Sequence, residues 1–286
     1  MRTRIIPLLC SILILAACDG SGLGLAESVS AESTTTQLSF ELVDLEQQGG
    51  SQCPEEIANS TEATAEAEGE LCATVKFRYP KINSEAKPEL AEKLNAFILR
   101  QMVDNPVEGM AAENMTPEQF AEGFIQEYTE APNPFSSWEL DRSIRIVFTT
   151  KNMITLLFEE YGYTGGAHPY SGYRYSVLSL EDGRQIQLAD LLNPAYEAAL
   201  NVAGEKIFRE TRKLKEEETL EEQGFAFPND VFSLNDNFGV LKEGLDFIFN
   251  SYEIAPYALG PTQFTVPYED IQELVSPEGE LGQSAK

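Results

Sequence analysis

Histidine is almost absent from this chain: His168 is the only one among 286 residues. Zinc sites are usually built from several histidine and cysteine ligands, and the metalloprotease helix motif needs two histidines one turn apart. A single imidazole supports neither arrangement. The sequence therefore predicts no metal site, no cofactor and no catalytic centre built on paired histidines.

Basic residues are also scarce. The chain has 20 lysines and arginines against 47 aspartates and glutamates, which gives a formal net charge of −27. Phosphate backbones and anionic lipids repel such a surface, so nucleic acid is not expected as a partner. A basic protein would be attracted, although the same charge also serves simply to keep an exported protein soluble.

Long apolar runs are missing except near the start of the chain. Residues 5–17 are apolar with a single exception, follow Arg2 and Arg4, and fall short of the roughly 20 residues that span a bilayer. Such a segment is typical of an export signal. It ends in Leu-Ala-Ala-Cys at Cys18, the pattern of a bacterial lipobox. We therefore expect residues 1–17 to be cleaved as a lipoprotein signal peptide and Cys18 to carry the lipid.

Lipidation at Cys18 predicts where the protein works. The lipid would be its only membrane attachment, on the periplasmic side of a bacterial membrane, and Asp19 resembles the enterobacterial signal for retention at the inner membrane. Cleavage would remove two basic and no acidic residues, which moves the formal net charge from −27 to −29. An ordinary signal peptide followed by an unrelated cysteine is the alternative.

Cysteine is scarce as well, with four in the chain. Cys10 lies in the export signal and Cys18 takes the lipid, which leaves Cys53 and Cys72. In an oxidising compartment such a pair is expected to form a disulfide, here across a polar loop. No histidine lies near either thiol, which disfavours a metal-binding or catalytic role.

The apolar pattern of the first half predicts both strands and helices. Strands are expected at residues 37–45, 71–79, 138–149 and 153–161. A helical stripe marks residues 88–103, and a capping box at Thr116 begins a second helix. We therefore expect an N-terminal α+β domain at residues 37–161, preceded by a flexible tether at residues 18–36.

The second half continues this mixture. A hairpin is expected at residues 173–188, a long helix from Asn193 to Gly224, a hairpin at 238–249, and a last strand and helix at 264–266 and 268–274. These elements make a C-terminal domain at residues 162–276, followed by a flexible tail at residues 277–286. The predicted fold class is α+β, with antiparallel sheets, packed helices and two subdomains.

The densest unusual segment is YGYTGGAHPY at residues 161–170. Its glycines and proline require a specific backbone path, and its rings offer a contact surface. A second aromatic segment, residues 252–260, is expected to pack beneath it and to line a groove. His168 could instead only bind a backbone carbonyl and hold the two halves together. The candidate partner-binding residues are Gly165, Gly166, His168, Pro169, Tyr170, Tyr252 and Tyr257.

Patterns that indicate catalysis are not found. Ser171 lacks the glycine that a nucleophile elbow needs, and no phosphate-binding glycine loop precedes a helix. Carboxylates are so abundant that spacing neither supports nor excludes paired-acid glycan chemistry. We therefore expect a protein that is not an enzyme. The glutamates at residues 216–222 form either a solvated helix end or a docking surface for a basic protein.

Several segments together resemble a known family. The second half resembles the C-terminal domain shared by the ectodomains of the RsiV anti-sigma factor and certain peptidoglycan deacetylases, and the first half resembles the domain that precedes it. The likeness covers residues 37–275 and is more specific in the second half. The segments that carry it are GGAHP at 165–169, LADLL at 188–192, YEIAPY at 252–257, VPY at 266–268, FRYPKI at 77–82 and LNAFI at 94–98.

The resemblance implies an α+β fold in two parts and a cell-envelope setting. The best-understood member implies recognition of lysozyme, a strongly basic protein, without catalysis. This chain lacks that sensor's transmembrane helix and cytoplasmic segment, and an appended deacetylase domain, so a signalling role is not expected. We expect a lipid-anchored module that binds a lysozyme-type muramidase or a peptidoglycan fragment. A glycan-processing enzyme using carboxylates and a purely structural envelope protein are the alternatives.

Overall fold

The computed structural model describes residues 4–5, 38–50, 53, 71–104, 115–131 and 135–284. Cys18, the expected tether at residues 18–36 and nearly all of the expected export signal lie outside the described residues. None of the helices in the described part of the chain has the length and apolar content that a membrane span requires.

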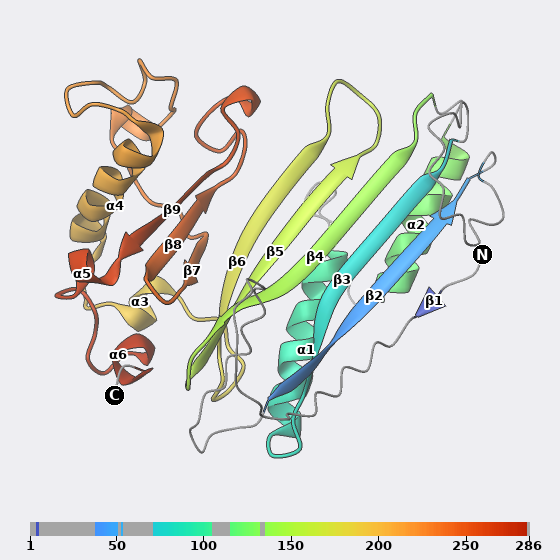
Figure 1. Cartoon of the computed structure of the whole chain (residues 1–286), viewed down its shortest axis with the longest axis horizontal. Helices are drawn as coiled ribbons and strands as arrows, with labels where there is room; N and C mark the ends of the chain where they lie inside the picture. Colours follow the sequence, from blue (N-terminus) through green and yellow to red (C-terminus); the bar gives the residue numbers. More distant parts are fainter. Residues whose placement is uncertain are drawn as a thin grey trace, which may run out of the picture.

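The first sheet has six strands, arranged in sequence order from β1 to β6 (Figure 1). Neighbouring strands are antiparallel except β3 and β4, which are parallel because two helices carry the chain back from the end of β3 to the start of β4. All four strands expected in the first half are present. The bounds are β1 Arg4–Ile5, β2 Ser39–Gly49, β3 Ala73–Asn83, β4 Trp138–Thr149, β5 Met153–Tyr163 and β6 Tyr170–Ser179.

Two helices cover one face of this sheet (Figure 1). The first, α1 Pro88–Val103, has the bounds that its apolar stripe predicts. Its side chains Leu94, Ile98 and Met102 are buried in the core between the helix and the sheet. The second, α2 Pro117–Glu130, begins at the predicted capping box. The Thr116 hydroxyl accepts a hydrogen bond from the Gln119 amide at 3.3 Å, and the Gln119 side chain accepts one from the Thr116 amide at 2.9 Å.

The expected disulfide is present between Cys53 and Cys72, whose Cα atoms lie 5.0 Å apart. Cys72 is buried directly before β3. The bond closes the connection from β2 to β3, and a cross-link of this kind stabilises the fold mainly by restricting the unfolded chain.

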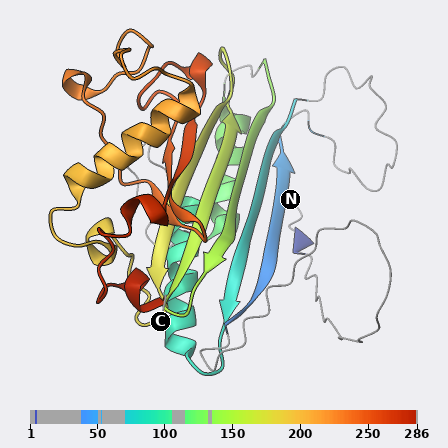
Figure 2. The same ribbon diagram turned by 60° about the vertical axis from the view of Figure 1, so that its left-hand side comes forward.

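The C-terminal residues form a second layer on the opposite face of the first sheet (Figure 2). Its antiparallel sheet contains β7 Phe238–Val240, β8 Gly244–Phe249 and β9 Thr262–Pro267. The long helix α4 Glu197–Arg212 packs against β9. Phe208 of α4 lies at the centre of the core, with ring centroids 5.0 to 6.4 Å from those of Phe225, Phe227, Phe232, Phe249 and Phe264. The short helices are α3 Leu188–Leu191, α5 Tyr268–Ile271 and α6 Glu280–Ser284.

The strand β5 is buried on both faces. Ile154, Leu156 and Phe158 face α1 and α2, whereas Met153 and Leu157 contact the C-terminal layer. A continuous apolar run is typical of a strand that is covered on both sides. The boundary expected after residue 161 therefore falls inside a shared sheet, because β6 pairs with β5 from Met153↔Ser179 to Gly162↔Tyr170.

The outer edge of β6, the last strand of its sheet, is covered by two asparagine side chains. Asn237 Oδ1 accepts a hydrogen bond from the Tyr175 amide, and Asn250 Oδ1 accepts one from the Tyr173 amide, both at 2.8 Å. Both Nδ2 groups donate to the Tyr173 carbonyl, at 2.9 and 3.0 Å. These amides take the place of a neighbouring strand and tie the C-terminal layer to the first sheet. We call Asn237 and Asn250 the asparagine clamp.

A buried carboxylate makes a second connection between the layers. The Tyr175 hydroxyl donates to Asp246 Oδ2 at 3.0 Å, and Gln263 donates to the same oxygen at 2.8 Å. The Thr265 hydroxyl donates to Asp246 Oδ1 at 2.5 Å. Burial, followed by the charge of Asp246, raises the pKa of the Tyr175 hydroxyl, so this group stays protonated and donates throughout the physiological range.

The helix expected from Asn193 to Gly224 is much shorter than predicted. Its end is set by Lys213, whose left-handed backbone (φ 57°) stops the helix after Arg212. The chain then turns so that Leu220 enters the core. The glutamates at residues 216–222 would repel one another along a helix, and they lie in turns, mostly exposed.

Two further expectations need correction. The hairpin expected at residues 173–188 is shorter than predicted. The Ser179 amide donates to the Arg184 carbonyl at 2.9 Å and the Ile186 amide donates to the Val177 carbonyl at 2.8 Å, on either side of the antiparallel bridge between Leu178 and Gln185, and α3 then begins at Leu188. The tail expected to be flexible includes α6, which packs against α3, and Glu280 lies 3.6 Å from the Arg184 guanidinium. The tail is ordered by contacts with α3 and Arg184, which lie about ninety positions earlier in the chain.

Replacing Asn237 with alanine should lower the free energy of unfolding by about 2 kcal/mol, because the Tyr175 amide at the layer interface loses its acceptor. Urea unfolding of both proteins measures the difference. Asn237→Asp keeps the acceptor oxygen but sets a carboxylate oxygen against the Tyr173 and Ile248 carbonyls, to which Nδ2 donates at 2.9 and 3.0 Å, and should not recover the loss. A change below about 0.5 kcal/mol for the alanine variant would show that the clamp does not stabilise the fold.

Candidate functional site

Three of the predicted partner-binding residues meet at one end of the molecule, although 84 residues separate His168 from Tyr252. His168 lies in the loop between β5 and β6, and Tyr252 and Tyr257 lie in the connection from β8 to β9 (Figure 1). The His168 ring stacks on Tyr257, with ring centroids 4.0 Å apart and an interplanar angle of 17°. The Tyr252 centroid lies 6.3 Å from that of His168 and 5.7 Å from that of Tyr257.

We call His168, Tyr252 and Tyr257 the aromatic cluster. His168 is exposed, Tyr252 is 65% exposed, and Tyr257 is half-buried. Exposed aromatic side chains that lie together are typical of surfaces that another molecule covers. The cluster therefore offers a preformed contact surface.

Both ring nitrogens of His168 are hydrogen-bonded. Nδ1 lies 2.9 Å from the Pro169 carbonyl oxygen, and Nε2 lies 3.1 Å from the Tyr252 hydroxyl. A carbonyl oxygen can only accept, so Nδ1 carries the proton in the neutral imidazole. Nε2 then accepts a hydrogen bond from Tyr252. The bond to Pro169 is local, whereas the bond to Tyr252 connects the loop between β5 and β6 to the C-terminal layer. The His168 ring also faces solvent.

The two glycines before His168 shape this loop. Gly165 and Gly166 have φ values of 90° and 106°, which side chains with a Cβ rarely adopt. The Tyr163 hydroxyl donates to the Gly166 carbonyl at 3.2 Å and closes the turn. These glycines position the imidazole through the backbone path that they permit.

Tyr170 lies apart from the aromatic cluster. Its ring covers Gly162, where a Cβ would come 2.2 Å from the ring carbon Cζ. Burial and the nearby charge of Glu160 raise the pKa of the Tyr170 hydroxyl. Glu160 in turn forms an ion pair with the buried Arg142, which also donates to the Met102 carbonyl at the end of α1 at 2.7 Å. Tyr170 therefore belongs to the face of the sheet that carries the helices.

Arg212 holds the loop that carries Tyr257. Its guanidinium donates to the carbonyl oxygens of Leu259, Gly260 and Pro261 at 3.2, 3.4 and 3.1 Å, and also to the Thr262 hydroxyl. One side chain thereby fixes the backbone next to the aromatic cluster. The sequence contains no signal for this role, because the partners are about fifty positions further along the chain.

A groove of about 760 Å³ begins beside Tyr252. The buried side chains of Phe225, Phe227, Ile254 and Ala255 form its apolar floor. All of the charged residues that line it are acidic, namely Glu221, Asp230 and Glu253. The aromatic cluster and the groove share Tyr252, so they form one continuous surface.

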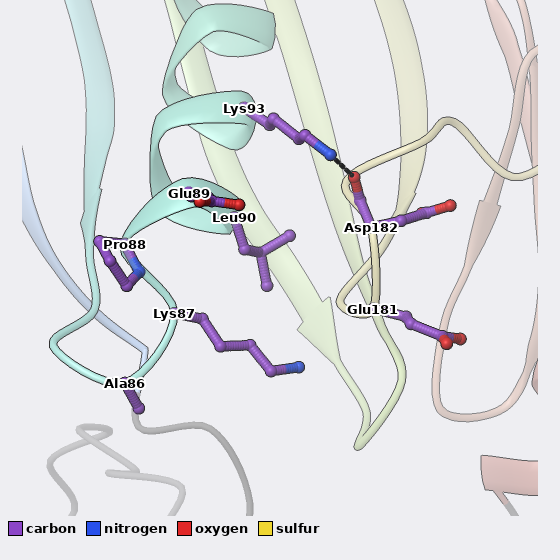
Figure 3. Close-up of a pocket in the computed structure, with 8 residues that line it drawn as sticks. All are labelled: Ala86, Lys87, Pro88, Glu89, Leu90, Lys93, Glu181 and Asp182. Atoms are coloured by element: carbon purple, nitrogen blue, oxygen red, sulfur yellow. Dashed lines mark hydrogen bonds between the residues drawn. The ribbon is translucent and has the colours of Figure 1, made fainter.

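A second pocket, of about 390 Å³, lies where the turn after β6 meets the start of α1 (Figure 3). Lys93 Nζ donates to the Asp182 carbonyl at 3.1 Å, and Lys87 Nζ donates to the Leu180 carbonyl at 3.0 Å. Both amines therefore hold the turn against the helix. Throughout the described ranges there is no group of three or more His, Cys, Asp or Glu side chains that could hold a metal ion.

A largely antiparallel sheet backed by two helices, followed by a second antiparallel sheet with its own helix, defines an α+β protein with two packed parts. Residues 66–171 match the family described as deacetylase PdaC, and residues 189–269 match the family described as a protein of unknown function, DUF3298. The resemblance predicted from the sequence is confirmed for these two regions, which represent uncharacterised envelope-type domains. The first match extends past residue 161 and includes His168.

Two solved structures share this fold. A member of the DUF3298 family from Bacteroides fragilis NCTC 9343 has a TM-score of 0.69 and 19% sequence identity, over 89% of this chain and 100% of that chain. A DUF3298 family protein from Pseudomonas aeruginosa PAO1 has a TM-score of 0.57 and 17% identity, over 84% of this chain and 95% of that chain. At these identities the likeness concerns the fold alone. No curated protein matches this chain.

The single histidine gives an unambiguous test of the hydrogen bonds at His168. Two-bond ¹H–¹⁵N correlation spectra of the neutral imidazole should show the proton on Nδ1. Tyr252→Phe removes the donor to Nε2 and should shift the Nε2 resonance while Nδ1 stays protonated. A ring protonated mainly on Nε2 would contradict the described contacts.

Proposed function

We propose that this protein is a non-catalytic lipoprotein of the cell envelope that binds a cell-wall-related partner through the aromatic cluster. Its anchor would be a lipid on Cys18, which places it on the periplasmic side of a bacterial membrane. A chain with Cys18→Ala that still partitions with membranes would contradict this anchor. In this proposal the partner is either a basic lysozyme-type muramidase or a peptidoglycan fragment.

The observation that carries the proposal is the exposed, preformed aromatic cluster. His168 is held by both of its nitrogens and by stacking on Tyr257, so little side-chain freedom is lost when a partner binds. Aromatic side chains are enriched among the residues that dominate binding energy. A cluster assembled from two distant loops and left open to solvent supports a role in contact.

Charge favours the basic protein over the glycan fragment. The formal net charge of −27 attracts a cationic protein over long range and accelerates its association. The groove beside the cluster is lined by carboxylates and by no basic residue. A neutral glycan would gain nothing from either feature.

Isothermal titration of the full chain with a lysozyme tests this function. Binding should weaken as salt is added, because the attraction between opposite charges is screened. Replacing both His168 and Tyr257 with alanine should weaken binding at least about tenfold. Tyr161→Ala is the matched control, because Tyr161 is 42% exposed and is not a member of the cluster.

Three results would reject parts of the proposal. Absence of salt-sensitive binding to lysozymes would remove the protein partner. Turnover of isolated cell wall that depends on single acidic residues near His168 would indicate a glycan-processing enzyme. A variant with His168→Ala and Tyr170→Ala that folds and complements a deletion would favour a purely structural role.

A further inference from the structure

The groove beside the aromatic cluster is formed by two loops that are fixed to each other. The Ala226 amide donates to the Ile254 carbonyl at 2.7 Å and joins the two loops across the floor. Within the first loop, the Glu221 amide donates to Asp230 Oδ1 at 2.8 Å. The walls of the groove are therefore set before any ligand arrives.

Backbone strain is concentrated at the same place. In the described part of the chain, five residues other than glycine have positive φ, and three of them line the groove: Asn229 and Asp230 at 57° and Tyr252 at 69°. Such conformations cost free energy and persist where the surrounding structure enforces them. Here they direct Asp230 and Tyr252 to the groove.

The acidic side chains of the groove differ in how firmly they are held. Glu253 accepts hydrogen bonds from Asn235 Nδ2 at 2.6 Å and from the Asn250 amide at 2.8 Å, which fixes its carboxylate. Glu221 is exposed at the rim. The groove therefore combines an anchored negative charge with an adaptable one.

An apolar floor beneath acidic walls matches one kind of side chain. Arginine and lysine have an aliphatic stem that packs on apolar surface and a cationic head that binds carboxylates. A neutral sugar has no charge to meet these carboxylates, and an anionic ligand would be repelled by them. Charge and shape together select a long basic side chain.

We propose that this groove receives an arginine or lysine side chain from an exposed segment of a basic partner protein. The stem lies over Phe225 and Ile254, and the cationic head lies among Glu221, Asp230 and Glu253. The partner's flanking residues cover Tyr252 and the aromatic cluster. This inference rests on the proposed function and adds the feature of the partner that is recognised.

The test compares two substitutions of glutamate by glutamine, each of which removes one negative charge. Glu221→Gln changes a residue that lines the groove, and Glu217→Gln changes an exposed glutamate that does not line it. In calorimetric titrations of the full chain with a lysozyme at fixed salt, Glu221→Gln should weaken binding about fivefold. Glu217→Gln should change it less than about twofold. Glu221→Asp keeps the charge and should retain most of the affinity.

The outcomes separate this inference from the function on which it rests. If the unmodified chain does not bind lysozyme, the basic protein partner of the proposed function and the inference fail together. If the unmodified chain binds, and the variant lacking His168 and Tyr257 binds weakly, but Glu221→Gln behaves like Glu217→Gln, only the inference is overturned. Circular dichroism of each variant establishes that the fold is intact.

Discussion

Backbone groups at the edge of a sheet need hydrogen-bond partners, and in this protein the edge of β6 finds them in side chains. Asn237 and Asn250 bond to the backbone of Tyr173 and Tyr175 and thereby attach the C-terminal layer. A polar group left without a partner at a buried interface costs about 1 to 3 kcal/mol. These hydrogen bonds therefore fix the position of the C-terminal layer on the first sheet, and the loops that carry Tyr252, Tyr257 and the groove are positioned with it.

Asn250 shows how this contact reaches the candidate site. Its side chain belongs to the asparagine clamp, its backbone amide holds Glu253 at the groove, and Tyr252 follows two positions later. The same turn thus connects the sheet edge, the groove and the aromatic cluster. On the other side, His168 is held by a loop that begins at the end of β5. The cluster forms because two loops from two sheets are each fixed at their base.

Much of the fold could be predicted from local patterns. The apolar stripe of residues 88–103 gives α1 with its observed bounds, and Thr116 starts α2 with the hydrogen bonds of its capping box. Local patterns failed for α4, since Lys213 ends the helix while the residues after it continue to have helical propensity. The domain boundary expected after residue 161 lies within one sheet, because β5 pairs with β6 across it.

The site was predictable only in part. Aromatic and turn residues marked both loops and predicted that residues 252–260 pack beneath the first one. No sequence pattern indicated that Tyr257 would be the ring that stacks on His168, or that Tyr170 would lie over Gly162. The roles of Arg212 and of the asparagine clamp depend on partners roughly 50 to 80 positions away, beyond the reach of local patterns. Rigid contacts of this kind allow an exposed surface to keep one shape.

Docking of the C-terminal layer brings Tyr252 and Tyr257 to His168 and thereby preforms the aromatic cluster. Nuclear Overhauser effects from the ring protons of His168 test this arrangement in solution. Strong effects to the ring of Tyr257 and weaker effects to the ring of Tyr252 are expected in the unliganded chain. A folded chain whose His168 ring gives no effect to either tyrosine would contradict it.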